Sequence, residues 1–270
     1  MNAASSSNAA PEGARPAPAC GPGSAPAARR MAVRPAYAAL PQPVLQPLPR
    51  HAHSVGGLVP FSTVDWPGKL AAVVFIAGCP WRCHYCHNTE LQTRTARYDW
   101  HDIRAFLETR KGLLDAVVFS GGEPLSEPRL AQMIRDVRRM GYQVGMHTAG
   151  IYPLRLADVL QHLDWVGLDI KADAAGYDDI TGRRDSERPA MSCLAQLLSA
   201  RRDFECRVTW HPDWFDETRL LDVARELSRR GVRRFAVQGA RSTPDSPAAR
   251  HLSAQAESRM REWFETFEYR

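Results

Sequence analysis

The sequence predicts an α/β fold built on a parallel sheet, with a disordered extension in front of it. The first observation is that short apolar and β-branched runs alternate with longer amphipathic stretches from about residue 55 onward. Strands that alternate with helices form a parallel sheet with right-handed crossovers. The second observation is that 10 of the 20 prolines lie in the first 50 residues, which are poor in bulky apolar side chains.

Residues 1–50 form the predicted extension, and residues 51–270 form the predicted folded domain. A segment rich in Pro, Ala and Ser buries too little apolar surface to offset the entropy lost on ordering, so we expect it to be disordered. We interpret it as an upstream extension, or as a start assigned too early with Met31 as the alternative start, rather than as a targeting peptide.

Charge and hydropathy argue against two classes of protein. The net charge is +5, and four of these charges belong to the extension, which carries five arginines and one glutamate. The folded part is therefore nearly neutral, so we expect no nucleic-acid partner. No apolar run approaches the ~20 residues of a membrane helix, so we expect a cytoplasmic protein with no membrane partner.

Six strands and six helices are predicted in alternation. In chain order, the runs AAVVFIA, AVVFS, YQVGMH, WVGLDI, FECRVTW and RFAVQ predict strands at Ala71–Ala77, Ala116–Ser120, Tyr142–His147, Trp165–Ile170, Phe204–Trp210 and Arg234–Gln238. The amphipathic stretches predict helices at Trp100–Thr109, Ser126–Met140, Pro153–His162, Arg188–Arg201, Asp216–Arg230 and Leu252–Phe267. Asp216 is the predicted N-cap of the fifth helix, and Gly231 ends it. The buried face of that helix is predicted at Leu220, Val223, Ala224 and Leu227.

Three of the six cysteines, Cys79, Cys83 and Cys86, lie within eight residues. A disulfide framework is disfavoured because three clustered cysteines leave one unpaired, and no secretory signal precedes them. A zinc site needs a fourth ligand, which His84 or His87 could supply. Three thiolates on a tight loop also suit a [4Fe–4S] cluster whose fourth iron is open to a ligand that is not protein. We expect Cys193 and Cys206 to be buried structural residues and Cys20 to have no role.

The spacing C-x3-C-x2-C, with Tyr85 just before the last cysteine, resembles the signature of the radical S-adenosylmethionine (SAM) superfamily. The resemblance implies a partial (β/α)6 TIM-like barrel. It also implies a [4Fe–4S] cluster on the three cysteines, with S-adenosylmethionine chelated at the open iron. The reduced cluster then cleaves this cofactor to a 5′-deoxyadenosyl radical that abstracts a hydrogen atom from the substrate. Cofactor and cluster thus supply the chemistry, so no protein side chain is assigned a catalytic role.

Other motifs follow predicted strands, where a β/α barrel places its chemistry. Gly121-Gly122-Glu123-Pro124 is similar to the superfamily motif that holds the methionine amino group. In the motif His147-Thr148-Ala149-Gly150, the resemblance assigns Thr148 to the cofactor. His147 and Ala149 depart from the acidic residue and the asparagine of related activating enzymes, so no monovalent-cation site is carried over. His147 is then either a hydrogen-bonding or a structural residue.

Alternation along the fourth strand points Asp169 and Lys171 to the same side, as a structural ion pair or as cofactor contacts. Their resemblance to the Asp-x-Lys motif of glycyl-radical activating enzymes favours the cofactor. Arg207 aligns with an arginine of those enzymes and is a candidate carboxylate clamp. Gln238 either reaches the adenosyl group or is an ordinary polar strand end. Three tryptophans are predicted to be packing residues, namely Trp66, Trp210 and Trp214.

Two segments indicate which members of the superfamily the sequence resembles most. The stretch from Gly57 to Leu70, and Cys86-His87-Asn88 at the end of the cysteine loop, resemble the anaerobic ribonucleoside-triphosphate reductase activating proteins and, secondarily, pyruvate formate-lyase activating enzyme. Asn88 is accordingly a candidate cofactor-binding residue. The resemblance implies abstraction of a glycine α-hydrogen from a partner enzyme, with electrons from a low-potential donor such as flavodoxin or ferredoxin.

Two alternatives stay open at this point. One is a radical SAM enzyme that acts on a small molecule, for instance a 7-deazapurine-forming member, because one fold supports many reactions. The other is a non-enzymatic zinc or Fe–S binding module.

Overall fold

A computed structural model of the protein describes residues 53–241 and 251–270. The predicted extension, Met31 and Cys20 lie outside these residues. The strands are β1 (Val55–Ser62), β2 (Ala71–Ile76), β3 (Ala116–Gly121), β4 (Gln143–Thr148), β5 (Trp165–Asp169), β6 (Phe204–Trp210), β7 (Arg234–Gly239) and β8 (Thr266–Tyr269). The helices are α1 (Trp100–Glu108), α2 (Leu130–Arg139), α3 (Pro153–Leu160), α4 (Tyr177–Thr181), α5 (Glu187–Ser199), α6 (Glu217–Arg229) and α7 (Ala254–Trp263), with short 3-10 helices η1 (Thr89–Leu91) and η2 (Pro124–Ser126).

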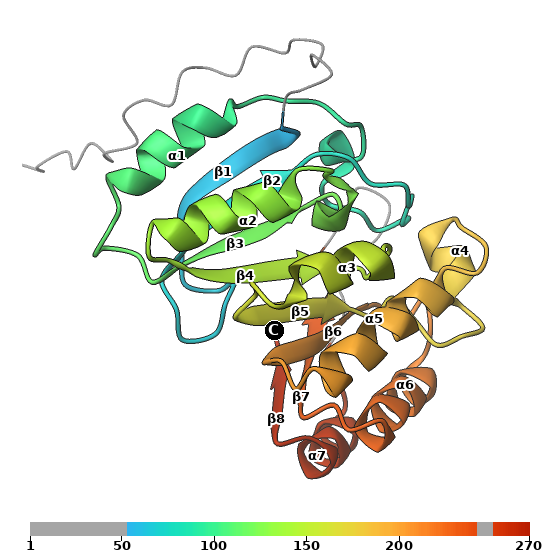
Figure 1. The fold of residues 1–270 in the computed structure, drawn as a ribbon. Helices are drawn as coiled ribbons and strands as arrows, with labels where there is room; N and C mark the ends of the chain where they lie inside the picture. Colours follow the sequence, from blue (N-terminus) through green and yellow to red (C-terminus); the bar gives the residue numbers. More distant parts are fainter. Residues whose placement is uncertain (1–52, 242–250) are drawn as a thin grey trace, which may run out of the picture. The chain divides into compact units, whose positions relative to one another are not determined.

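All eight strands form one sheet whose spatial order is the chain order, β1 to β8. Every pair from β2 to β8 is parallel, as continuous apolar runs such as AAVVFI and AVVF predict for strands buried on both faces. Figure 1 shows α2, α3 and α5 on the same side of this sheet. The predicted α/β fold with a partial β/α barrel is therefore confirmed. Strand β6 has the predicted bounds, β2, β3, β5 and β7 differ from theirs by one residue at one end, and β4 is shifted by one residue at both ends.

The sheet has two more strands than predicted. Strand β1 was missed because two glycines and Pro60 weaken its strand pattern. It pairs antiparallel with β2, and the register shifts between Val59 and Ser62, which accommodates the proline at the edge of the sheet. Gly56 lies so close to the segment after the cysteine loop that an added Cβ would stand 2.5 Å from the Leu91 side chain.

The predicted last helix, Leu252–Phe267, is wrong at its carboxyl end. Helix α7 ends at Trp263, and the next residues form β8 against β7. Phe264 and Phe267 are spaced as on one helix face, yet Phe264 stacks on Phe235 at 4.8 Å and Phe267 pairs with Phe235 across the sheet. Burial against β7 thus decided a segment whose spacing alone favoured a helix.

Helix α2 begins at Leu130 and not at the predicted Ser126. The reason is Pro128, which disfavours helical backbone at the residue before it, and Glu127 is extended. Two predictions for α6 hold. Asp216 caps the helix by accepting a hydrogen bond from the Arg219 N–H at 2.8 Å, and Gly231 follows its end with a φ of +97°.

An apolar cluster fills the amino-terminal end of the barrel interior. It includes Trp66, which stacks on Trp165 at 5.6 Å and confirms the predicted packing role. Trp66 comes from the loop between β1 and β2, so this loop enters the curve of the sheet. In residues 53–241 and 251–270, no helix is long and apolar enough to cross a membrane.

Candidate active site

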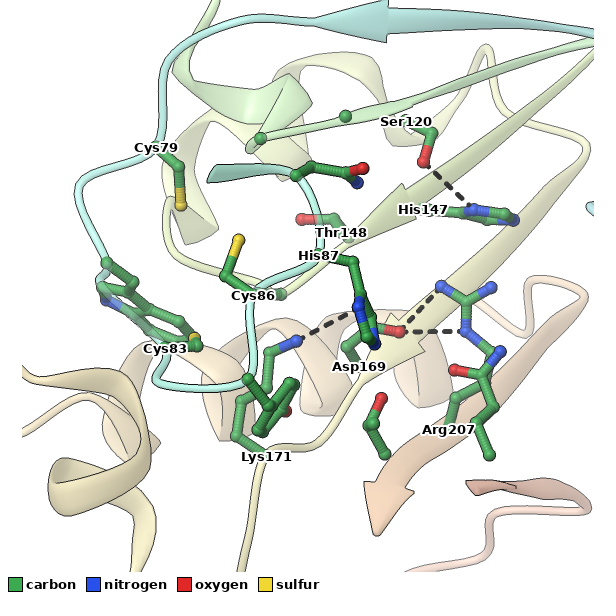
Figure 2. A pocket seen from close by; sticks show the side chains of 18 of the residues that line it. Cys79, Cys83, Cys86, His87, Ser120, His147, Thr148, Asp169, Lys171 and Arg207 are labelled. Atoms are coloured by element: carbon green, nitrogen blue, oxygen red, sulfur yellow. Dashed lines mark hydrogen bonds and ion pairs between the residues drawn. The ribbon is translucent and has the colours of Figure 1, made fainter. Parts of the chain in front are cut away.

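The carboxyl ends of the parallel strands surround one cavity of about 690 Å3. The lining includes most of the predicted site residues, namely Cys79, Cys83, Tyr85, Cys86, Asn88, Gly121, Gly122, Thr148, Asp169, Lys171, Arg207 and Gln238. Figure 2 shows the three cysteines on one side of the cavity, Ser120, His147 and Arg207 on the other, and Asp169 between them. The structure thus brings together side chains that are up to about 160 residues apart in the chain.

The cysteine loop follows β2 and is held by backbone hydrogen bonds on both flanks. The Gly78 and Cys79 N–H groups donate to the carbonyls of Leu91 and Gln92 at 2.7 and 3.0 Å. The Arg82 N–H donates to the carbonyl of Thr181, at the end of α4, at 2.9 Å. These contacts fix a loop that has no regular structure of its own, so the positions of the thiols are set before any ligand binds.

The three thiols are free and partly exposed to the cavity. Burial raises the pKa of the Cys79 thiol to about 12 and also raises the pKa of the Cys83 thiol. In the described part of the chain, no three His, Cys, Asp or Glu side chains are close enough to hold a single metal ion. A [4Fe–4S] cluster does not require that convergence, because each thiolate binds a different iron. The donor set therefore fits such a cluster.

Gly121 and Gly122 allow two backbones to approach each other. A Cβ on Gly121 would lie 2.4 Å from the Ile76 carbonyl oxygen, and one on Gly122 would lie 2.7 Å from the carbonyl oxygen of Leu91. The two glycines thus let the turn after β3 pack against the end of β2 and the flanks of the cysteine loop. Gly121 has a φ of +117°, which only glycine adopts readily.

Glu123 and Pro124 are not among the residues that line the cavity, and their contact with the cofactor stays a prediction. Both are buried, and Glu123 has no exposed surface. The Glu123 carboxylate accepts hydrogen bonds from the Thr148 hydroxyl at 2.7 Å and from the N–H groups of Ala149 and Leu125 at 3.0 Å. It thus ties the turn after β3 to the turn after β4, and both of its oxygens accept hydrogen bonds from the protein.

Glu123 gives a test of this structural role through pH. Burial raises its pKa to about 7, against the lowering effect of the hydrogen bond from Thr148. Because the folded pKa lies above the ordinary value of 4.5, the folded state binds more protons between these values. Its contribution to stability therefore falls as pH rises through that window.

We expect the free energy of unfolding to fall by about 2 kcal/mol more in the wild type than in Glu123→Gln when the pH rises from about 5 to about 7.5. Urea unfolding of both proteins at the two pH values measures the difference. Parallel pH dependence in the two proteins would mean that Glu123 is not the buried titrating group.

Asp169, Arg207 and Lys171 form a charged row along the cavity. Asp169 and Arg207 are direct neighbours across β5 and β6, and Arg207 donates twice to one oxygen of Asp169, at 2.9 and 2.7 Å. The Lys171 ammonium lies 3.4 Å from the other oxygen. Burial favours a higher pKa for Asp169, but Arg207 and then Lys171 outweigh it and lower this pKa to about 2. Two cations against one carboxylate leave a net positive charge for an anionic ligand group.

Tyr85, within the cysteine loop, packs against two other segments of the chain. Its ring stacks on Trp214 at 4.6 Å, and the Lys171 ammonium lies 5.7 Å from the ring centre. Trp210 is buried and donates its indole N–H to the Phe215 carbonyl at 2.9 Å. The predicted packing roles of Trp210 and Trp214 agree with these contacts, and Cys193 and Cys206 are fully buried as expected.

Sequence reasoning missed part of the cavity wall. Val64 and Asp65 reach it from the loop between β1 and β2, and Arg241 and Arg270 reach it from the carboxyl-terminal part of the chain. The stretch that contains Val64 and Asp65 had been singled out only for its resemblance. No spacing rule connects it with a strand end, because β1 runs against the other strands.

Comparisons with known proteins agree on the family. The family model described as the radical SAM superfamily matches residues 73–206. A Methanocaldococcus jannaschii protein, named as a candidate glycyl-radical enzyme activating enzyme, is 31% identical over 185 residues, which cover 64% of this chain and 75% of that protein. The pyruvate formate-lyase-activating enzyme of Clostridium pasteurianum is 35% identical over 128 residues, which cover 44% of this chain and 53% of that enzyme.

A solved structure shows the same fold. A radical SAM methyltransferase from Sphaerobacter thermophilus superposes with a TM-score of 0.57 at 14% identity, covering 76% of this chain and 67% of that one. At this identity the likeness concerns the fold alone.

Proposed function

The chain belongs to the radical SAM superfamily, and from this premise we propose that it activates a partner enzyme by abstracting a glycine α-hydrogen, which leaves a glycyl radical. The observation that carries the proposal is the cavity that joins three free cysteines to the strand-end residues Asp169 and Lys171. The relatives in Methanocaldococcus jannaschii and Clostridium pasteurianum, whose names designate activating enzymes, support this reaction over others on the same fold.

Cys79, Cys83 and Cys86 would hold the cluster, and the cavity is large enough for S-adenosylmethionine beside it. Bound together, cluster and cofactor supply a 5′-deoxyadenosyl radical when an electron is delivered. The row of Arg207, Asp169 and Lys171 would bind the carboxylate of the cofactor, because its net charge is positive. The remaining proposed cofactor contacts are Tyr85, Asn88, Gly121, Gly122, Thr148 and Gln238.

We propose anaerobic (class III) ribonucleoside-triphosphate reductase as the partner, and a low-potential protein such as flavodoxin or ferredoxin as the electron donor. The stretch from Gly57 to Leu70 supports this partner through its resemblance to the activating proteins of that reductase. In the structure, part of the same stretch forms the cavity wall at Val64 and Asp65. The segment that carries this resemblance therefore contributes to the cavity where we propose that the substrate binds.

The test is to mix the anaerobically reconstituted, reduced protein with S-adenosylmethionine and the reductase of the same organism. We expect an electron paramagnetic resonance (EPR) doublet from the glycyl radical and release of 5′-deoxyadenosine. A reductase with its radical glycine replaced by alanine is the control, and it should give no doublet. Cofactor cleavage without a doublet would contradict the proposed partner, and turnover of a small molecule without any protein partner would favour the alternative radical enzyme. A colourless protein with stoichiometric zinc would favour a binding module.

A further inference from the structure

His147 lies at the end of β4 with its imidazole on the cavity wall. Its Nε2 is 2.6 Å from the backbone carbonyl oxygen of Asp65. A carbonyl oxygen can only accept a hydrogen bond, so Nε2 must carry the proton. Burial, and next the nearby Arg207, lower the pKa of His147 to about 3, so the ring is neutral at working pH. Nδ1 therefore presents a lone pair and no hydrogen.

A second acceptor faces this lone pair. Oδ1 of Asp65 lies 3.9 Å from Nδ1 of His147, whereas Oδ2 of Asp65 accepts a hydrogen bond from the Ser62 hydroxyl at 2.5 Å. The Ser120 hydroxyl lies 3.3 Å from Nδ1, which is longer than an ordinary O–H···N bond, and Arg207 and Arg270 line the same cavity. With only this long contact from Ser120 to Nδ1, the two facing acceptors keep capacity for a donor from a ligand.

The imidazole is held in one orientation. Its edge packs against Trp165, with ring centroids 5.5 Å apart and planes at 70°. Trp165 is itself stacked on Trp66, in the same loop that supplies Asp65. The acceptor pair is thus built by β4 and the loop between β1 and β2, and packing on both sides sets its direction.

The position of the acceptor pair favours the substrate, and not the cofactor, as the ligand that this pair contacts. Figure 2 shows His147 and Ser120 on the side of the cavity opposite the three cysteines. Val64, next to Asp65 in the same loop, is exposed to solvent and also lines the cavity. A partner chain can therefore reach the cavity from this side. The glycine itself has no side chain, so at that residue the peptide N–H is the donor available to orient it.

We propose that His147, together with Asp65, is a positioning residue that accepts a backbone N–H of the partner's glycine segment and so turns one α-hydrogen toward the cofactor. This inference rests on the proposed function. Fixing the N–H beside the reacting carbon selects between the two α-hydrogens of glycine, because that carbon then has a single orientation.

The test compares three holoenzymes, wild type, His147→Phe and His147→Gln, with the anaerobic reductase as substrate. Phenylalanine keeps the ring but removes the acceptor, whereas glutamine can donate to the Asp65 carbonyl and still accept. We expect the ratio of glycyl radical formed to 5′-deoxyadenosine released to fall about 10- to 100-fold in His147→Phe and to stay within about threefold of wild type in His147→Gln. Asp65→Asn, which places a donor opposite Nδ1, should lower the ratio as well.

Two further measurements separate this role from others. The dissociation constant of S-adenosylmethionine, measured without the reductase, should be within about twofold of wild type in His147→Phe, and thermal unfolding should confirm that the variant is folded. An unchanged radical-to-deoxyadenosine ratio in folded His147→Phe would overturn the inference. So would a parallel loss of cofactor binding, which would place His147 in the cofactor site. Failure of the wild type itself to form the radical would instead contradict the proposed function.

Discussion

Replacing Cys83 with alanine should remove the iron and sulfide from anaerobically prepared protein and abolish cleavage of S-adenosylmethionine, with a loss of at least about 1,000-fold. Cys83 shares the cavity with Cys79 and Cys86, so the change leaves two thiols for a cluster that already lacks a fourth protein ligand. Neither of the other cysteines in the described residues can replace Cys83 as a ligand, because Cys193 and Cys206 are fully buried and do not line the cavity. Iron and acid-labile sulfide analysis measures the result.

Cys193→Ala is the matched control for this experiment. Its thiol is fully buried and donates to the Gly150 carbonyl at 3.3 Å, so its loss removes a packing contact and no cluster ligand. We expect unchanged iron content and a small decrease in stability, about 1 kcal/mol. Iron retained at wild-type level in Cys83→Ala would show that the cluster has other ligands, and the proposed chemistry would lose its basis.

Gly121→Ala should lower the free energy of unfolding by about 4 kcal/mol, a large part of the stability of an ordinary domain. Two costs add in this variant. A residue with a side chain is strained at a φ of +117°, and the new methyl group would meet the Ile76 nitrogen and oxygen at 2.5 and 2.4 Å. Backbone atoms cannot turn aside as a side chain can, so β2 and β3 would separate where the cysteine loop begins.

Gly141→Ala is the control that separates the cost of backbone strain from the cost of the close contact. Gly141 also has a positive φ, +94°, but no atom lies within 4 Å of an added Cβ. Urea unfolding should show a loss of about 1 kcal/mol for this control, which carries the backbone strain alone. Equal losses in the two variants would mean that the close contact with β2 is relieved at no cost. We also expect Gly121→Ala to bind less iron than Gly141→Ala, because its displaced strand ends support the thiols.

Neighbouring residues in the chain account for what was predictable about the site. The three clustered cysteines lie within eight residues, so the sequence alone places them close together. Alternation predicted Asp169 and Lys171 on the same side, and both line the cavity. The runs that predict β2 to β7 are buried on both faces, so their composition is distinctive. Strand β1, with its glycines and proline, has no such pattern, and the segment that forms β8 is too short to outweigh its helical spacing.

The hydrogen bonds of Glu123 could not be predicted from its motif. Its motif pointed to a cofactor contact, but three donors from the protein occupy its carboxylate. Two of these donors belong to Thr148 and Ala149, 25 and 26 residues further along the chain. Which way a carboxylate at a turn points depends on donors that only the packed turns bring near it.

From the sequence alone came the α/β class, the six central strands, the three thiols and the charged pair at the end of β5, since spacing and alternation are properties of consecutive residues. Only the tertiary structure decided that Arg207 pairs with Asp169, that Glu123 faces inward, and that Asp65 meets His147 across 82 residues. These contacts depend on sheet register and on the path of a loop into the barrel. Packing of the whole domain sets both, and no local pattern encodes them.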